Sequence, residues 1–228
     1  MTQAVLGIIG GSGIYDLPGL ENAREELAHQ NEFQYAIINK DFEAARHELA
    51  DIIRKGYERV GLTYDDGLPR QVSELSHGYP HYTHLLGLWA GRRALEASRD
   101  VVIDTDLREA IPAALENATG GVQQEYASAV ASSQPDALFE KVLLACAQAN
   151  KDSLGKFSAT DVRAPLRRII GRDMLTGAYQ SHLAKFCETE RGPILKKSGK
   201  RRSYKWRFVN PQVIPYIILR GKEAGLVT

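Results

Sequence analysis

The densest group of residues that could do chemistry lies between positions 196 and 207. Seven of these twelve residues are cations, namely Lys196, Lys197, Lys200, Arg201, Arg202, Lys205 and Arg207. Tyr204 and Trp206 alternate with them. Cations at this density neutralise phosphates and release condensed counterions. The pattern predicts contact with a nucleic-acid backbone or minor groove, and a solvated basic loop is the alternative interpretation.

The chain around this cluster predicts how it is positioned. Strand-like runs at 193–197 and 204–209 flank Ser198-Gly199-Lys200, which is typical of a β-hairpin with a glycine turn. Helices are expected at 134–150, from Ser158 or Thr160 to Gly171, and at 175–190. A last helix is expected from Asn210 to Arg220. Three helices followed by a hairpin have the order of a winged helix.

The third of these helices is the expected recognition helix. Its polar residues include Thr176, Gln180, Ser181 and Lys185. Gln180 and Lys185 are therefore predicted DNA contacts together with the seven cations of the hairpin. The helix carries few cations, so the hairpin is expected to supply most of the affinity.

Charge is distributed unevenly along the chain. The net charge is only +1, but the segment from Arg191 to Lys222 contains ten Lys or Arg residues and no Asp or Glu. The remainder is consequently net acidic. This asymmetry predicts an anion-binding surface near the C-terminal end, and double-stranded DNA is the expected partner.

Three histidines could in principle bind a metal ion. His77, His81 and His84 are spaced by four and three residues. Gly78 and Pro80 interrupt the first interval, and neither Cys nor a carboxylate is nearby in the sequence. Capping or packing roles are therefore expected, and no metal site is predicted.

A glycine-rich segment lies close to the N-terminus. The apolar run 4–9 precedes Gly10-Gly11-Ser12-Gly13, which is typical of a buried strand followed by a tight loop. Backbone N–H groups of Gly11, Ser12 and Gly13 could face a phosphate, and a structural turn is the alternative. The segment is neither a P-loop nor a GxGxxG motif.

Residues 5–16 (VLGIIGGSGIYD) resemble the start of methylthioadenosine phosphorylases. The resemblance implies that Ser12 helps to bind phosphate. It extends over about residues 4–22, and no ribose-binding or purine-binding motif of that family follows. One strand and a loop cannot form the complete phosphorylase pocket.

Helical patterns dominate from Phe42 onward. Helices are expected at 43–60, after the potential caps Asp65 and Asp66, at 81–98, and from the potential cap Asp104 to about Asn117. Gly61 is expected to end the first, and Pro69 to lie in the first turn of the second. Four helices in this order predict a small bundle.

Residues 54–62 (RKGYERVGL), 75–88 (LSHGYPHYTHLLGL) and 207–216 (RFVNPQVIPY) resemble bacterial AAA+ ATP-binding proteins, distant relatives of origin-recognition initiators. The resemblance covers about residues 42–228 and implies a lid subdomain followed by a winged helix. It also implies that Gly78 and Pro80 form the turn before the sensor-2 helix, where His81 would face the ATP phosphates.

The residues of a complete ATPase site are missing. The sequence contains no P-loop lysine and no accompanying metal-binding acid, so phosphoryl transfer would lack its main electrostatic stabilisation. No complete cofactor site and no catalytic residues are therefore expected. ATP could be bound only together with a missing or partner ATPase core.

These observations predict a mainly α protein with three regions. They are a short N-terminal strand, loop and linker (1–41), an AAA+ lid-like helical bundle (42–131) and a winged-helix domain (132–228). No apolar run is long enough for a membrane span, and a cytoplasmic location with buried free thiols at Cys146 and Cys187 is expected. Three functions remain open: a DNA-binding ATPase module, a module that only binds ATPase subunits, and a phosphorylase.

Overall fold

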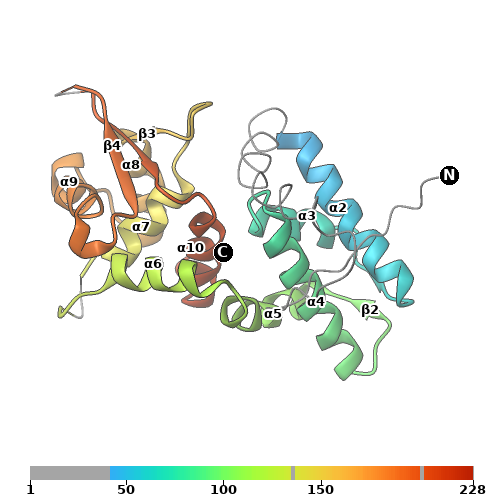
Figure 1. Ribbon diagram of the computed structural model, residues 1–228. Helices are drawn as coiled ribbons and strands as arrows, with labels where there is room; N and C mark the ends of the chain where they lie inside the picture. The colour runs from blue at the N-terminus through green and yellow to red at the C-terminus, as the bar shows by residue number, and fades with distance from the viewer. Residues whose placement is uncertain (1–41, 135–136, 201–202, 228) are drawn as a thin grey trace, which may run out of the picture.

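The computed structural model describes residues 42–134, 137–200 and 203–227. The described chain is mainly helical with two small sheets, which confirms the predicted fold class (Figure 1). The N-terminal strand and the loop with Gly11, Ser12 and Gly13 fall outside the described residues. Within the described ranges, no helix is long and apolar enough to cross a membrane.

The N-terminal part of the described chain is a helical bundle. Its helices are α2 (Phe42–Arg59), α3 (Leu68–Leu75), α4 (Pro80–Glu96) and α5 (Asp104–Glu116). Gly61 ends α2 with a φ of 70°, a left-handed conformation that glycine adopts without steric cost. A short parallel pair, β1 (Thr63–Tyr64) and β2 (Val101–Val102), closes one end of the bundle.

Two predicted caps in the bundle were wrong. Helix α3 begins after Gly67, and the carbonyl of Asp65, rather than its side chain, accepts a hydrogen bond from Leu68 N at 2.9 Å. Helix α5 begins after Ile103, whose backbone N–H donates to the carboxylate of Asp106 at 2.9 Å. The acidic residues were correctly placed near helix starts, but the capping geometry was not specified by residue type.

One helix of this region was not predicted. Helix α6 (Gly120–Val130) follows α5 and packs against α7, α10 and the 3-10 turn η1 (Thr189–Arg191). It opens with two glycines, which are poor helix formers, and its buried residues Val122, Tyr126 and Ala129 are few. Packing against other elements therefore determines this helix more than its own sequence does.

The C-terminal part combines three helices with a three-stranded sheet. In chain order its elements are α7 (Phe139–Gln148), β3 (Phe157–Ser158), α8 (Ala159–Ile170), α9 (Thr176–Lys185), η1, β4 (Leu195–Ser198), β5 (Lys205–Phe208) and α10 (Val213–Glu223). The sheet has the order β3-β5-β4 and is antiparallel. These elements have the order of three helices and a hairpin on which the winged-helix prediction depends, and the hairpin also pairs with the short strand β3.

Local sequence determines helix α8 closely. The Ser158 hydroxyl accepts a hydrogen bond from Asp161 N at 3.3 Å, and the Asp161 carboxylate accepts from Ser158 N at 2.7 Å. This reciprocal pair is a capping box. Gly171 ends the helix in the left-handed conformation with a φ of 72°. Both ends confirm the prediction made from the sequence.

Helix α10 connects the two parts of the molecule. It packs against α7 of the C-terminal part and also against α5, α6 and α3. Figure 1 shows it between the bundle and the rest of the C-terminal part. Buried residues from Ile53 to Leu219 form one cluster. The division into regions at residues 131 and 132 stays a prediction.

Close packing of α10 on α7 requires a glycine. A Cβ atom added at Gly221 would lie 2.5 Å from Cδ2 and 2.8 Å from Cδ1 of Leu144, which is buried with 1% of its surface exposed. We expect Gly221→Ala to lower the free energy of unfolding by about 1–3 kcal/mol, because Leu144 has no space to move. Chemical denaturation measures this change.

Gly56 provides the matched control. It lies inside α2, and a Cβ added there would meet nothing within 4 Å. Gly56→Ala should therefore raise stability by about 0.5–1 kcal/mol through helix propensity alone. Equal stability changes at the two glycines would contradict the close contact between α10 and α7.

Candidate nucleic-acid interface

The hairpin of β4 and β5 is anchored to the core by alternate side chains. Leu195 lies opposite Phe208, and both are buried, as is Trp206. Lys196 lies opposite Arg207, and both are exposed. In an antiparallel pair, residues directly opposite each other point to the same face. The hairpin therefore holds its apolar residues inward and presents Lys196 and Arg207 together to solvent.

Lys196 and Arg207 form a candidate phosphate contact. Like charges directly opposite each other on a sheet repel, so this pair is electrostatically unfavourable without an anion. Among the described residues, no carboxylate forms an ion pair with either side chain. Figure 1 shows β4 and β5 extending from the helices at the top of the C-terminal part, and the hairpin that these two strands form is called the arm below. The pair lies next to the buried Leu195 and Phe208, on the solvent face of the arm.

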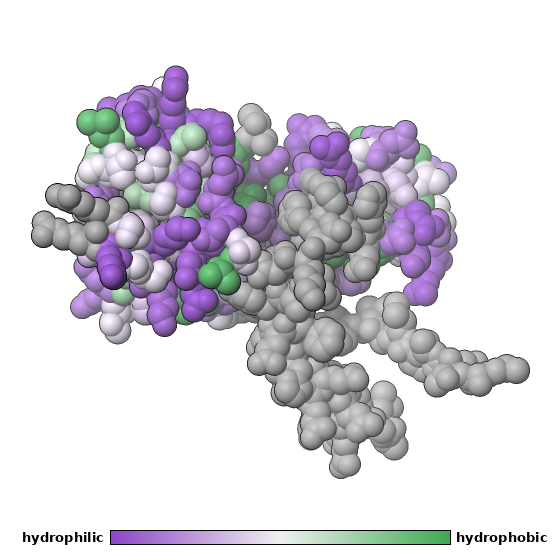
Figure 2. All heavy atoms as spheres, turned by 90° about the horizontal axis from the view of Figure 1, so that it is seen from above, coloured by the Kyte–Doolittle hydropathy of each residue, from purple (hydrophilic) through white to green (hydrophobic). Residues whose placement is uncertain are grey.

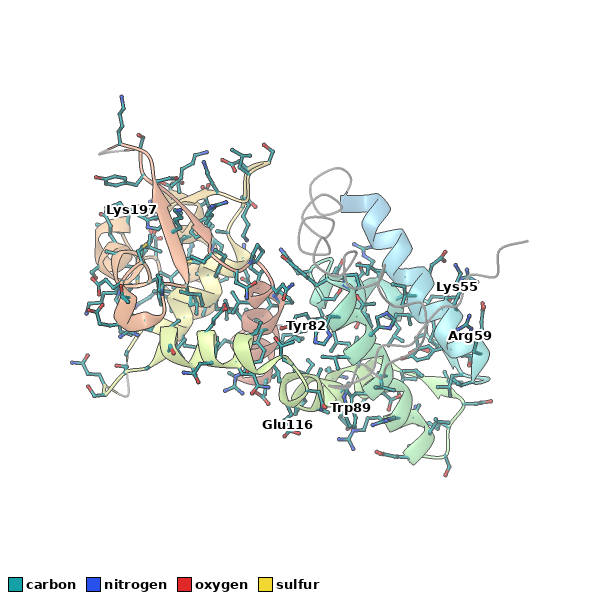
Figure 3. All side chains as sticks on the ribbon, in the orientation of Figure 1. Lys55, Arg59, Tyr82, Trp89, Glu116 and Lys197 are labelled. Carbon is teal, nitrogen blue, oxygen red and sulfur yellow. The ribbon has the colours of Figure 1, made fainter. Side chains whose placement is uncertain are left out.

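Lys197 and Tyr204 have a different arrangement from this pair. The Lys197 ammonium lies 3.6 Å from the centroid of the Tyr204 ring. The centroids of the Tyr204 and Trp206 rings are 6.3 Å apart. A lysine this close to a ring face is held by cation–π attraction. Figure 3 labels Lys197 on the hairpin. Its side chain is therefore held in position on Tyr204.

Lys205 is neutralised by an acid that sequence reasoning missed. Its ammonium lies 2.7 Å from the carboxylate of Asp152, in the loop between α7 and β3. The hydrogen bond from Lys205, together with backbone N–H groups of Lys156 and Leu154, lowers the pKa of Asp152 to about 2. Because Asp152 is far from Lys205 in sequence, only the pairing of β3 with β5 brings them together. The Lys205 ammonium therefore links β5 to the loop before β3, and it is less available to a phosphate than an unpaired cation would be.

Helix α9, the predicted recognition helix, has one buried face and one exposed face. Tyr179 and Leu183 are buried on one face, whereas Gln180 and Lys185 are exposed. The Tyr179 hydroxyl donates to the carbonyl of Ala159 at 2.8 Å, which fixes α9 against the start of α8. The helix ends at Lys185, five residues earlier than predicted, and a separate turn η1 follows.

The turn between α8 and α9 is fixed by an ion pair. The Arg163 guanidinium donates from Nε to Oδ1 of Asp173 at 3.0 Å and from Nη2 to Oδ2 at 2.5 Å. A two-point pair of this kind fixes orientation as well as distance. The exposed face of α9 is therefore held in a defined direction relative to α8.

Of the remaining cations predicted in the hairpin, the structure describes Lys200. Lys200 is exposed at the free end of the hairpin, next to Gly199, which has a φ of 92°. Arg201 and Arg202 lie outside the described residues, as do Gly11, Ser12 and Gly13. The structure therefore brings together Lys196, Lys200 and Arg207 on the arm, with Gln180 and Lys185 on a separate helix.

A turn containing Gly78 precedes helix α4, and its assignment to the sensor-2 region stays a prediction. Gly78 has a φ of 82°, and Pro80 is the first residue of α4. His81 lies on α4 near His84 with part of its ring still accessible. Partial desolvation of the ring is the main cause that lowers the pKa of His81, and the charge of His84 is the second. A neutral imidazole attracts phosphate less than a guanidinium does.

His77 instead lies in the turn before Gly78 with a φ of 50°. Across the described ranges, no three His, Cys, Asp or Glu residues could hold a metal ion.

Comparisons with known proteins gave two short or distant similarities. No family model matches the chain. A stretch of 27 residues, 12% of this chain, is 89% identical to S-methyl-5'-thioadenosine phosphorylase of Bradyrhizobium diazoefficiens. Among solved structures, Cdc6p from Pyrobaculum aerophilum is similar over 80% of this chain with 13% identity and a TM-score of 0.32.

Neither similarity assigns a family. The chain spans 9% of the length of the phosphorylase and 49% of the length of Cdc6p. A TM-score of 0.32 is too low to transfer a function. The function must therefore be inferred from the residues of the site itself.

Proposed function

We propose that this chain binds double-stranded DNA through its winged helix. The exposed cross-strand pair Lys196 and Arg207, on an arm anchored by Trp206 and Phe208, is the observation that carries the proposal. In this arrangement the arm contacts phosphates, and Gln180 on α9 is available for base edges in the major groove. The bundle of α2–α5 would then serve as the lid-like module of an ATPase whose core is supplied elsewhere.

The test is duplex binding by the full chain, measured by fluorescence anisotropy at several salt concentrations. A fixed 20-base-pair duplex should bind with an affinity that falls as salt rises. The logarithmic slope should be roughly 0.9 for each phosphate neutralised, and therefore about 2–3 for the cations on the arm. Binding that is absent or insensitive to salt would exclude the proposal.

A substitution at Gln180 tests base recognition independently of phosphate contact. Gln180→Ala should alter the relative affinities of different duplexes by about 1–3 kcal/mol at a recognised base pair while leaving the salt slope unchanged. The measurement compares a panel of duplexes at one salt concentration. If all duplexes lose affinity equally, then α9 does not lie in the major groove.

A second candidate function is binding to another protein without DNA contact. The bundle exposes Leu88 and Leu95 on α4, with 50% and 56% of their surfaces accessible. Between them, Trp89 is covered on one face by the Arg92 guanidinium, 4.6 Å from the ring centroid (Figure 3). The exposed side chains of Leu88 and Leu95 are apolar groups that suit a contact with an ATPase subunit. Co-purification with such a subunit, without DNA binding, would favour this function.

A further inference from the structure

A cavity of about 850 Å³ lies between the bundle and the winged helix. One wall is His77, in the turn between α3 and α4. The other walls are the end of α7 with residues up to Lys151, Arg168 on α8, and Ile218 on α10 with the residues that follow it. In Figure 2 the two parts are seen from above with a hollow between them. Cavities of this size are common binding sites for small molecules.

Positive charge dominates the polar side of this cavity. Its cations are Lys151 and Arg168, His77 adds an imidazole, and none of its described lining residues is acidic. The Lys151 ammonium donates to the carbonyls of Ala147 at 2.6 Å and Ala149 at 3.1 Å, which fixes it at the end of α7. An ammonium group has three donors, so one remains after these two bonds.

Burial leaves the charge of Lys151 only partly compensated. Burial lowers the pKa of Lys151 to about 8. Burial is also the main cause that lowers the pKa of His77 to about 4, and the nearby charge of Lys151 is the second cause. At pH 7, Lys151 is therefore still mainly charged and His77 is neutral. The carbonyl oxygens carry only partial negative charge, so an anion in the cavity would stabilise the ammonium further.

The apolar side of the cavity defines the rest of the ligand. Ile218, Leu226 and Val227 lie among its lining residues, and the amide side chains of Gln148 and Asn150 provide neutral polar groups. A bare inorganic anion would leave this apolar side in contact with water. An anion with a small apolar group would cover it.

We propose that this cavity binds a small phosphate monoester, with its phosphate at Lys151 and Arg168 and its organic group against Ile218 and Leu226. The site is separate from the DNA-binding arm and does not depend on the function proposed above. Arg168 provides the two-point contact that a guanidinium makes with phosphate, and Lys151 provides a point charge.

The proposal is tested by calorimetric titration of the full chain with phenyl phosphate, inorganic phosphate and phenol at constant ionic strength. Phenyl phosphate should bind with one site per chain and more tightly than inorganic phosphate, and phenol should not bind measurably. Equal affinities for phenyl phosphate and inorganic phosphate would exclude the role of the apolar side. Failure of phenyl phosphate to bind would exclude the site.

Two charge-matched variants locate the site. Arg168→Gln should weaken phenyl phosphate binding by about tenfold or more, because one charge-assisted contact is lost. Arg172→Gln should change it less than twofold, since Arg172 is exposed just after α8 and does not line the cavity. Lys196→Ala/Arg207→Ala should also leave it unchanged. Equal effects of Arg168→Gln and Arg172→Gln, or loss of binding in the arm variant, would overturn the proposal.

Discussion

Replacing Lys196 and Arg207 together with alanine is expected to weaken duplex DNA binding roughly 50-fold at 0.1 M salt. Each lost phosphate contact reduces the slope of log affinity against log salt concentration by about 0.9, so two lost contacts reduce it by about 1.8. The same change should be measured for every duplex sequence, because phosphate contacts carry no base information. Fluorescence anisotropy across a salt series measures both quantities.

The pair is chosen because its removal should leave the fold intact. Both side chains are exposed, and they lie opposite each other, so their replacement removes a repulsion from the hairpin. Lys205 is left unchanged because its bond to Asp152 ties β5 to the loop before β3. Thermal unfolding of the double variant should be unaltered.

A charge-matched control lies on α2. Lys55→Ala/Arg59→Ala removes the same two charges, and Figure 3 shows both residues at the end of the molecule away from Lys197. This control should retain parental affinity within a few-fold and the parental slope. If the control and the arm variant lose equal affinity, net charge rather than the arm explains binding, and the DNA-binding proposal fails in its present form.

Asp106→Ala is expected to lower the free energy of unfolding by about 3 kcal/mol, the largest stability effect of a single substitution proposed for this chain. Asp106 is 2% exposed, and its carboxylate accepts bonds from two nitrogens of Arg99, at 2.9 and 2.5 Å, and from Ile103 N. Alanine would leave the guanidinium and the N–H of Ile103, the residue before α5, without these partners.

The pH dependence follows from the direction of the pKa shift. Hydrogen bonds from Arg99 are the main cause that lowers the pKa of Asp106 below its usual value. The folded state therefore binds this proton less readily than the unfolded state does. The stabilisation is complete above the unfolded pKa of about 4, and is lost as pH falls through the lower folded pKa.

Asp104→Ala is the matched control for this prediction. Asp104 lies in the first turn of the same helix, but its side chain is 50% exposed and pairs with exposed Arg108. Its loss should cost less than about 1 kcal/mol. Urea denaturation at pH 7 and pH 3 measures both variants. A cost at Asp106 as small as that at Asp104 would contradict the role assigned to the Arg99 pair.

Much of the C-terminal fold could be predicted because its signals are local. Ser158, Asp161 and Gly171 define the ends of α8 through bonds within three or four residues. The hairpin follows from a glycine turn between alternating apolar and cationic residues. By contrast, α6 and β3 have weak local preferences, and their formation depends on packing and pairing with distant segments.

The candidate DNA contacts were predicted as a set but not individually. Residue type alone makes Lys196, Lys197, Lys205 and Arg207 equivalent cations. Strand register places Lys196 opposite Arg207 on the exposed face, the ring of Tyr204 holds Lys197, and Asp152 neutralises Lys205. These distinctions depend on which side chains become neighbours, which local spacing does not contain.

The sequence by itself determined a mainly helical chain, the ends of α8, and a basic hairpin near the C-terminal end, because helix caps, glycine turns and charge density act over a few residues. The tertiary structure alone decided which cations remain available to an anion. It also decided that His77, Lys151 and Arg168, from three separate elements, line one cavity. Both depend on burial and on contacts between residues far apart in sequence, which form only when the helices pack.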